Sequence, residues 1–63
     1  MNGPMEMASV HSKRMIETLL NVYALANMHR SSGDDEYRKS AAGWLPTLEH
    51  QLVALRAALE EAA

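Results

Sequence analysis

The chain has 63 residues and a formal net charge of −2, from six basic and eight acidic side chains. It has no cysteine, so disulfides and thiolate metal sites are excluded, and the acidic balance disfavours general binding to nucleic acid. A chain of this length forms one domain that buries only about 60% of its unfolded surface. We therefore expect association, with a second copy or with another protein, to complete its core.

The first eight residues contain Gly3 and Pro4 and show no helical period. They are predicted to form a flexible N-terminal tail, and residues 9–63 to form a helical hairpin. The start lacks the basic and apolar regions of a signal peptide, and the apolar runs are far shorter than the roughly 20 residues that span a membrane. The sequence predicts a cytoplasmic protein without a membrane span.

The first predicted helix runs from about Ser9 to Arg30, and Ser9 or Ser12 is expected to cap it. Its apolar residues form a stripe about 160° wide, which is broader than contact with one neighbouring helix requires. The stripe consists of Met15, Ile16, Leu19, Leu20, Val22, Tyr23 and Ala26. This width predicts that the helix faces two neighbours.

Leu25 and Met28 fall outside this stripe, beside Asn21 and Ala24. Scattered apolar residues are common on protein surfaces, so the two side chains have an ordinary explanation. The functional alternative is a second contact patch at the end of the first helix.

Residues 31–36, with the sequence SSGDDE, predict a tight turn between two helices. Gly33 suits the left-handed conformation that ends a helix, and Asp34 can cap the next one. Asp35 and Glu36 then lie in its first turn, where the helix dipole favours negative charge. A calcium-binding loop is not expected, because the alternating acidic ligands and the distal glutamate are missing. So short a connection makes the two helices antiparallel neighbours.

The second predicted helix runs from about Asp35 to Glu61 and carries a heptad row of apolar residues in alternating steps of four and three. The row consists of Ala41, Leu45, Leu48, Leu52, Leu55, Leu59 and Ala62. Gly43 and Pro46 interrupt it, because Pro46 removes a backbone donor and clashes with the Ala42 carbonyl. The helix is therefore either kinked or split here, and the common phase of Trp44 and the leucines favours a kink.

The sequence offers no constellation for catalysis, a cofactor or a metal. His11 and His29 would lie about 27 Å apart on a straight helix, so they cannot share a metal within one chain. Glu49, Glu60 and Glu61 lie off the leucine row, where two helices form no pocket for acid–base chemistry. We predict that the protein is not an enzyme and that it has no catalytic, cofactor-binding or metal site.

The predicted site is instead an interface with a protein partner or with further copies of the chain. Trp44 is expected either to pack in the core or to anchor the interface, and the two roles merge if a partner completes the core. The predicted interface residues are Met15, Leu19, Leu20, Val22, Tyr23, Leu25, Met28, Trp44, Leu45, Leu48, Leu52, Leu55 and Leu59.

A Gly33-Asp34 turn is followed by Tyr37, by Leu48-Glu49 and by two further leucines, Leu52 and Leu55. This pattern, over about residues 15–62, resembles the small E-component needle co-chaperones of bacterial type III secretion systems. Gly43 and Pro46 depart from the uninterrupted second helix of that family. The resemblance implies that the partner is a helical-repeat chaperone subunit and that the pair keeps a needle subunit soluble and unassembled.

The sequence thus predicts an all-α, antiparallel two-helix hairpin whose second helix is kinked or broken near Gly43 and Pro46. Its predicted function is that of a small helical protein–protein interaction module, a co-chaperone or adaptor that docks apolar stripes onto a helical partner. The alternative is a self-associating four-helix-bundle dimer with a regulatory or nucleic-acid-binding role.

Overall fold

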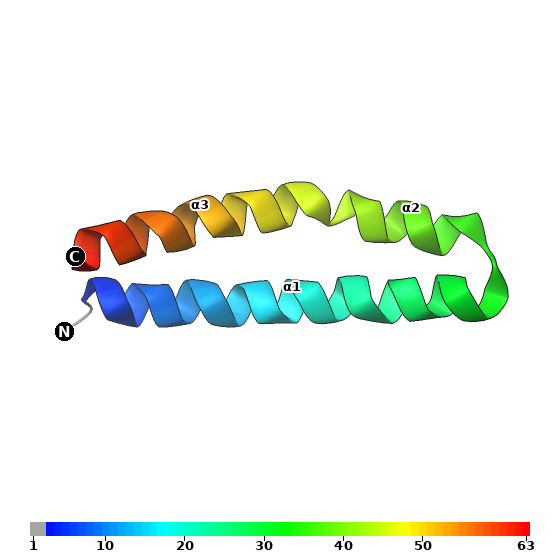
Figure 1. Cartoon of the computed structure of the whole chain (residues 1–63), viewed down its shortest axis with the longest axis horizontal. Helices are drawn as coiled ribbons and strands as arrows, with labels where there is room; N and C mark the ends of the chain where they lie inside the picture. Colours follow the sequence, from blue (N-terminus) through cyan, green and yellow to red (C-terminus); the bar gives the residue numbers. More distant parts are fainter. Residues whose placement is uncertain (1–2) are drawn as a thin grey trace.

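The computed structural model describes residues 3–63 and shows an antiparallel helical hairpin (Figure 1). Helix α1 spans Pro4–Ser32, and the returning arm consists of α2 (Asp35–Gly43) and α3 (Leu45–Ala62). Both α2 and α3 pack along α1, and the backbone extends over 46 × 16 × 14 Å. The prediction of an all-α hairpin is confirmed.

The first helix begins earlier than the sequence indicated. Pro4 occupies the first turn, where its missing N–H costs nothing, and the Gly3 carbonyl accepts a hydrogen bond from the Met7 N–H at 3.0 Å. The predicted tail is therefore wrong for residues 4–8, while Met1 and Asn2 lie outside the described residues. Neither Ser9 nor Ser12 caps the helix, and the Ser12 hydroxyl donates to the Ala8 carbonyl instead (2.7 Å).

The turn follows its prediction residue by residue. Gly33 has φ +72°, and its N–H donates to the His29 carbonyl (2.7 Å), which ends α1. The Asp34 carboxylate accepts from the Glu36 N–H (3.0 Å) and so caps α2. Two further hydrogen bonds brace the corner, because the Ser32 hydroxyl donates to the Met28 carbonyl and accepts from the Asp34 N–H.

The returning arm bends at Trp44, between α2 and α3. The Trp44 N–H donates to the Ala41 carbonyl (3.1 Å), and the Leu48 N–H donates to the Trp44 carbonyl (3.1 Å). Pro46 has no N–H to offer the Ala42 carbonyl, so the α-helical ladder is interrupted at one step. Trp44 nevertheless keeps helical dihedral angles (φ −83°, ψ −10°), and α3 continues along the side of α1 (Figure 1). The second helix is thus bent, as predicted.

The contact between the two arms follows a heptad seam in α1, with half-buried or buried residues in alternating steps of four and three. The α1 part of the seam is Pro4, Ala8, His11, Met15, Thr18, Val22, Leu25 and His29. This differs from the predicted stripe, of which only Met15 and Val22 face the returning arm. The expectation that Leu25 lies outside the hairpin contact is wrong, because it is half-buried in the seam. Hydropathy misplaced the seam because small and polar residues occupy part of it.

The returning arm contributes a matching row, offset from the predicted leucine row. The row is Tyr37, Ala41, Trp44, Leu48, Gln51, Leu55, Ala58 and Ala62. Leu48 and Leu55 face α1, whereas Leu45, Leu52 and Leu59 are about half exposed. The predicted row of apolar residues is thus divided between the contact with α1 and the surface.

A polar layer lies near the middle of the seam. Thr18 is buried and its hydroxyl donates to the Arg14 carbonyl (3.1 Å), towards which the Gln51 amide also points, with a longer separation of 3.5 Å. The Gln51 Oε1 is buried without a hydrogen-bond partner in the chain. Because a buried polar residue in a helical seam favours one register at some cost in stability, this layer fixes the alignment of α3 on α1.

Within residues 3–63, none of the helices combines the length and the apolar character needed to cross a membrane. A cytoplasmic location stays a prediction from the sequence.

Candidate functional site

One side of the hairpin is apolar, and the helical geometry explains why. A residue that follows a seam residue is turned by about 100° from the seam. Both arms are right-handed helices, and they run in opposite directions, so these following residues point to the same side of the hairpin. We call this side the outer face and define it by its apolar members: Met5, Ile16, Leu19 and Tyr23 of α1, and Leu45, Leu52 and Leu59 of α3.

These seven side chains are uncovered. Their exposed fractions range from 44% for Leu52 to 68% for Tyr23. The buried residues of the described chain, in contrast, are only Ala8, Thr18 and Ala58. The hairpin therefore leaves seven large apolar side chains on the outer face, and its most buried positions between the two arms hold small residues.

The opposite side of the hairpin is mixed in character. The residues that precede each seam residue there include the polar Arg14, Glu17 and Asn21 of α1 and His50 and Glu61 of α3, but also the exposed apolar residues Met7, Val10 and Met28 of α1. Along the apolar section of the outer face, the charged residues are Glu49 and Arg56, and both are exposed. The outer face thus carries more of the large apolar side chains than the opposite side does, which favours it as an interaction surface.

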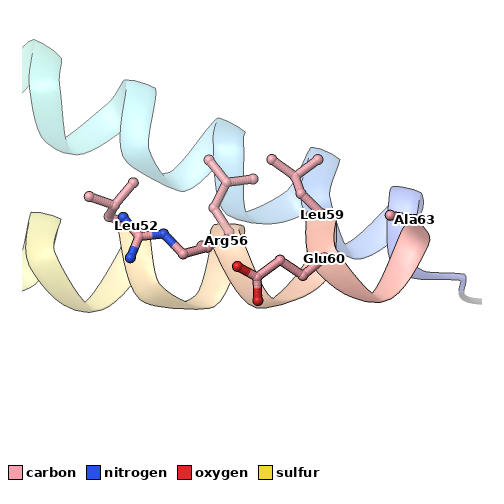
Figure 2. A pocket seen from close by; sticks show the side chains of 6 residues that line it. Leu52, Arg56, Leu59, Glu60 and Ala63 are labelled. Atoms are coloured by element: carbon pink, nitrogen blue, oxygen red, sulfur yellow. The ribbon is translucent and has the colours of Figure 1, made fainter.

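A shallow hollow of about 370 Å³ opens on the α3 part of this face (Figure 2). It is lined by Leu52, Leu55, Arg56, Leu59, Glu60 and Ala63. Figure 2 shows the lining side chains on successive turns of α3, with the charged groups of Arg56 and Glu60 beside the leucines. The hollow has the apolar floor and charged rim of a site that accepts an apolar side chain from another helix.

The predicted interface residues divide into three groups. Leu19, Tyr23, Leu45, Leu52 and Leu59 lie together on the outer face, whereas Met15, Val22, Leu25, Leu48 and Leu55 are half-buried between the arms. Trp44 lies at the edge of the seam with 37% of its surface exposed, and Leu20 and Met28 are exposed away from the outer face. The predicted second patch of Leu25 and Met28 does not form, because Leu25 belongs to the seam.

Sequence reasoning missed two members of the outer face. Met5 was assigned to the tail, although Gly3-Pro4 is a recognisable helix start. Ile16 was placed in the inward stripe but not in the interface. The signal that identifies both is a second heptad row in α1, offset by one residue from the seam: positions 5, 9, 12, 16, 19, 23 and 26.

Charge is concentrated instead at the turn. Arg38 forms two hydrogen bonds to the Asp35 carboxylate (2.6 and 2.9 Å), and Lys39 pairs with Glu36 at 3.5 Å. The hydrogen bond from Arg38, aided by its positive charge, lowers the pKa of Asp35 below 3.8. The His29 Nδ1 lies 2.9 Å from the Asp34 carbonyl, which ties that ring to the corner. In residues 3–63 no three histidine, aspartate or glutamate side chains gather as a metal site would require.

Comparisons with models of protein families, with curated proteins and with solved structures found no match to the chain. The resemblance to type III secretion co-chaperones therefore stays a prediction from the sequence.

Proposed function

We propose that the chain is a helical protein–protein interaction module that works by docking its outer face onto the helices of another protein. The observation that carries this proposal is where the hairpin places its apolar side chains. Seven large apolar side chains are uncovered on one face, while the three buried residues between the arms are small. An apolar patch of this kind is the usual mark of an interaction site.

The chemistry of the partner follows from the spacing of the face. On each arm the outer residues recur in alternating steps of four and three, as the residues of a helix-to-helix contact do. The partner is therefore built of helices rather than of strands or loops. The resemblance to the E-component co-chaperones supports a helical-repeat chaperone subunit as that partner, and the role of a co-chaperone or adaptor for this chain.

A photo-crosslinking amino acid placed on one side of the hairpin tests this proposal. We would introduce it singly at Leu19 or Leu52 on the outer face, and at Ala24 or Ala57 on the opposite side as matched, exposed controls. The variants would be produced at native levels in cells, and the covalent adducts identified by mass spectrometry.

We expect the outer-face positions to form an adduct with one helical protein, and the control positions to form none. Equal labelling from both sides, or the absence of any protein adduct from Leu19 and Leu52, would contradict the proposal. Adducts formed only with a second copy of the chain would favour a second candidate function, a self-associating four-helix bundle. The order of apolar and charged residues along α3 supports that second candidate.

A further inference from the structure

We infer that in the free protein the outer face is covered by a second copy of the chain, with the two hairpins face to face, their turns at opposite ends, and a two-fold axis at Leu52. The inference rests on the proposed function, because it takes the outer face to be a docking surface. It adds which molecule covers the outer face in the free protein, and how the helices of the resulting four-helix bundle are arranged.

The order of residues along the returning arm is self-complementary. The outer row reads Ala42, Leu45, Glu49, Leu52, Arg56, Leu59 and Ala63, and every member is exposed. Read from either end, it gives small, Leu, charged, Leu, charged, Leu, small, and the two charges are opposite in sign. A two-fold interface pairs residue i with j and j with i, so such a row is complementary to its own reverse.

An antiparallel contact centred on Leu52 makes these pairs explicit. Leu52 meets its own copy on the axis, Leu45 comes level with the partner's Leu59, and Glu49 comes within one residue, about 1.5 Å, of the level of the partner's Arg56. Each charged pair occurs twice. The ion pairs of the described chain are those of Asp35 with Arg38 and Glu36 with Lys39, so neither Glu49 nor Arg56 is engaged in one.

The hollow on α3 fits the same arrangement. The partner's Leu45 reaches the level of Leu59, where Leu55, Arg56, Leu59 and Ala63 line the hollow. An apolar side chain from one helix entering a space between four residues of another is the packing unit of helical bundles. In Figure 2 the side chains of Leu52 and Leu59 extend from α3 toward α1, with Arg56 and Glu60 beside them.

Helix α1 supports the same axis independently. The 3.5 Å approach of the Gln51 amide to the Arg14 carbonyl places the Leu52 level beside residue 14 of α1. A two-fold axis at that level lays the α1 helices of the two copies antiparallel. Ser12 then faces the partner's Ile16, Ser9 faces the partner's Leu19, and Met5 faces the partner's Tyr23. In two of these three pairs a serine faces a large apolar residue, which helps to fill space at the density that protein interiors require.

The opposite arrangement, with both turns at the same end, fits poorly. It would lay α3 against the partner's α1 and bring Glu49 level with the partner's Ile16, and Arg56 level with the partner's Ser9. Both charges would then be covered without a counter-charge, which is costly. Charge complementarity therefore selects turns at opposite ends.

The exposed area is of the size that a dimer needs. The hairpin exposes 4756 Å², whereas a compact monomer of 7.0 kDa exposes about 4,000 Å². The excess of about 700 Å² is close to the roughly 800 Å² that each partner buries in a stable interface. The surplus surface of one hairpin thus matches one side of a homodimer.

Charge exchange at Glu49 and Arg56 tests the axis. Glu49→Arg sets two arginines against each other at both pairs, and Arg56→Glu does the same with two glutamates. We expect each single variant to weaken dimerisation about tenfold or more, and the double variant Glu49→Arg/Arg56→Glu to restore it to near the original value. Sedimentation equilibrium over a range of concentrations measures the dissociation constant, and Glu17→Arg on the opposite side is the matched control.

A single cysteine gives a second, geometric readout. The chain has no cysteine of its own, so Leu52→Cys can form a disulfide only between copies, across the axis. We expect Leu52→Cys to oxidise to a covalent dimer with undiminished helicity, and Val53→Cys, which is exposed but turned away, to oxidise far more slowly.

The failures of the inference and of the proposed function are distinguishable. A helical monomer up to about millimolar concentration would overturn the dimer, and it would leave the crosslinking test of a different helical partner untouched. A dimer whose charge-exchanged double variant is not restored, and whose Leu52→Cys and Val53→Cys variants oxidise at equal rates, would overturn the axis. Conversely, a dimer that passes both tests stands even if no other protein is crosslinked.

Discussion

Gly33 and Gly43 show how backbone conformation, rather than available space, decides the effect of a substitution. An added Cβ would meet nothing within 4 Å at either position. Gly33 has a positive φ, in the left-handed region, while Gly43 is the last residue of α2 and has no positive φ. The first glycine is required by the turn, whereas the second only adds freedom to the unfolded chain.

We therefore expect opposite signs for the two alanine variants. Gly33→Ala should lower the free energy of unfolding by about 1 kcal/mol, because a left-handed conformation strains any residue with a Cβ. Gly43→Ala should raise it by about 0.5 kcal/mol, because alanine is the better helix former. Urea denaturation followed by circular dichroism measures both, and a loss of stability in Gly43→Ala would show that the bend at Trp44 needs a glycine.

Asp35 is the titrating group that the turn perturbs. Its bidentate bond with Arg38 lowers the carboxyl pKa in the folded protein below 3.8. Because this pKa is lower in the folded than in the unfolded protein, charged Asp35 stabilises the fold fully above pH 3.8. The stabilisation is lost as the pH falls through the lower pKa of the folded protein. Both side chains are exposed, so salt weakens the effect.

An NMR titration of the Asp35 carboxyl group checks this prediction. We expect a midpoint below 3.8 in the native protein and a return towards 3.8 in Arg38→Gln, which removes the charged donor. Lys39→Gln is the matched control, since Lys39 pairs with Glu36 instead. An unchanged midpoint in Arg38→Gln would assign the shift to the N-terminus of α2 rather than to Arg38.

At the scale of the elements, the contact between α1 and α3 is governed by its polar layer. Gln51 places an amide in the seam, yet its Oε1 is buried without a partner and its Nε2 approaches the Arg14 carbonyl only to 3.5 Å. A buried acceptor without a hydrogen bond costs about 1–3 kcal/mol. The layer thus trades stability for a defined alignment of the two arms, which in turn sets which residues share the outer face.

Replacement of Gln51 by leucine should therefore stabilise the hairpin by about 1–2 kcal/mol, because the buried oxygen is removed and apolar surface is added. We also expect the alignment of the arms to become less specific, with broader amide resonances in NMR spectra of the seam. Thermal and urea unfolding measure the first effect. His50→Leu, at an exposed neighbouring position, controls for the added hydrophobicity.

At the scale of the whole molecule, the proposed dimer would couple folding to association. The hairpin extends over 46 Å and is only 16 × 14 Å in cross-section, so none of its large side chains lies far from solvent. The three buried residues are small, and hydrophobic stabilisation is about proportional to the apolar area removed from water. In the proposed dimer, covering the outer face would therefore add stabilising apolar area that the single hairpin lacks.

This coupling predicts that stability depends on protein concentration. For a folded dimer in equilibrium with unfolded chains, a tenfold dilution should cost about 1.4 kcal/mol per dimer and lower the melting temperature. Circular dichroism melts over two orders of magnitude in concentration would reveal the shift. A melting temperature that does not change with concentration would show that the single hairpin is stable by itself.

The sequence by itself determined the helices, the turn and the bend, because these depend on local chemistry. Gly33 and Asp34 end one helix and begin the next, and Pro46 interrupts the backbone ladder wherever the helix packs. The early start of α1 was also readable at Gly3-Pro4, although the absence of an apolar period over residues 1–8 concealed it.

Only the tertiary structure decided which apolar row faces the other arm. Each arm carries two heptad rows one residue apart, and hydropathy ranks the row with Leu19 and Tyr23 above the row with Thr18 and Ala8. In α1 the structure uses the less apolar row for the hairpin, because small residues such as Ala8 and Thr18 let two helices approach closely. Leu45, Leu52 and Leu59 are consequently left on the surface, and the feature that looked like a core in the sequence is the candidate site of interaction.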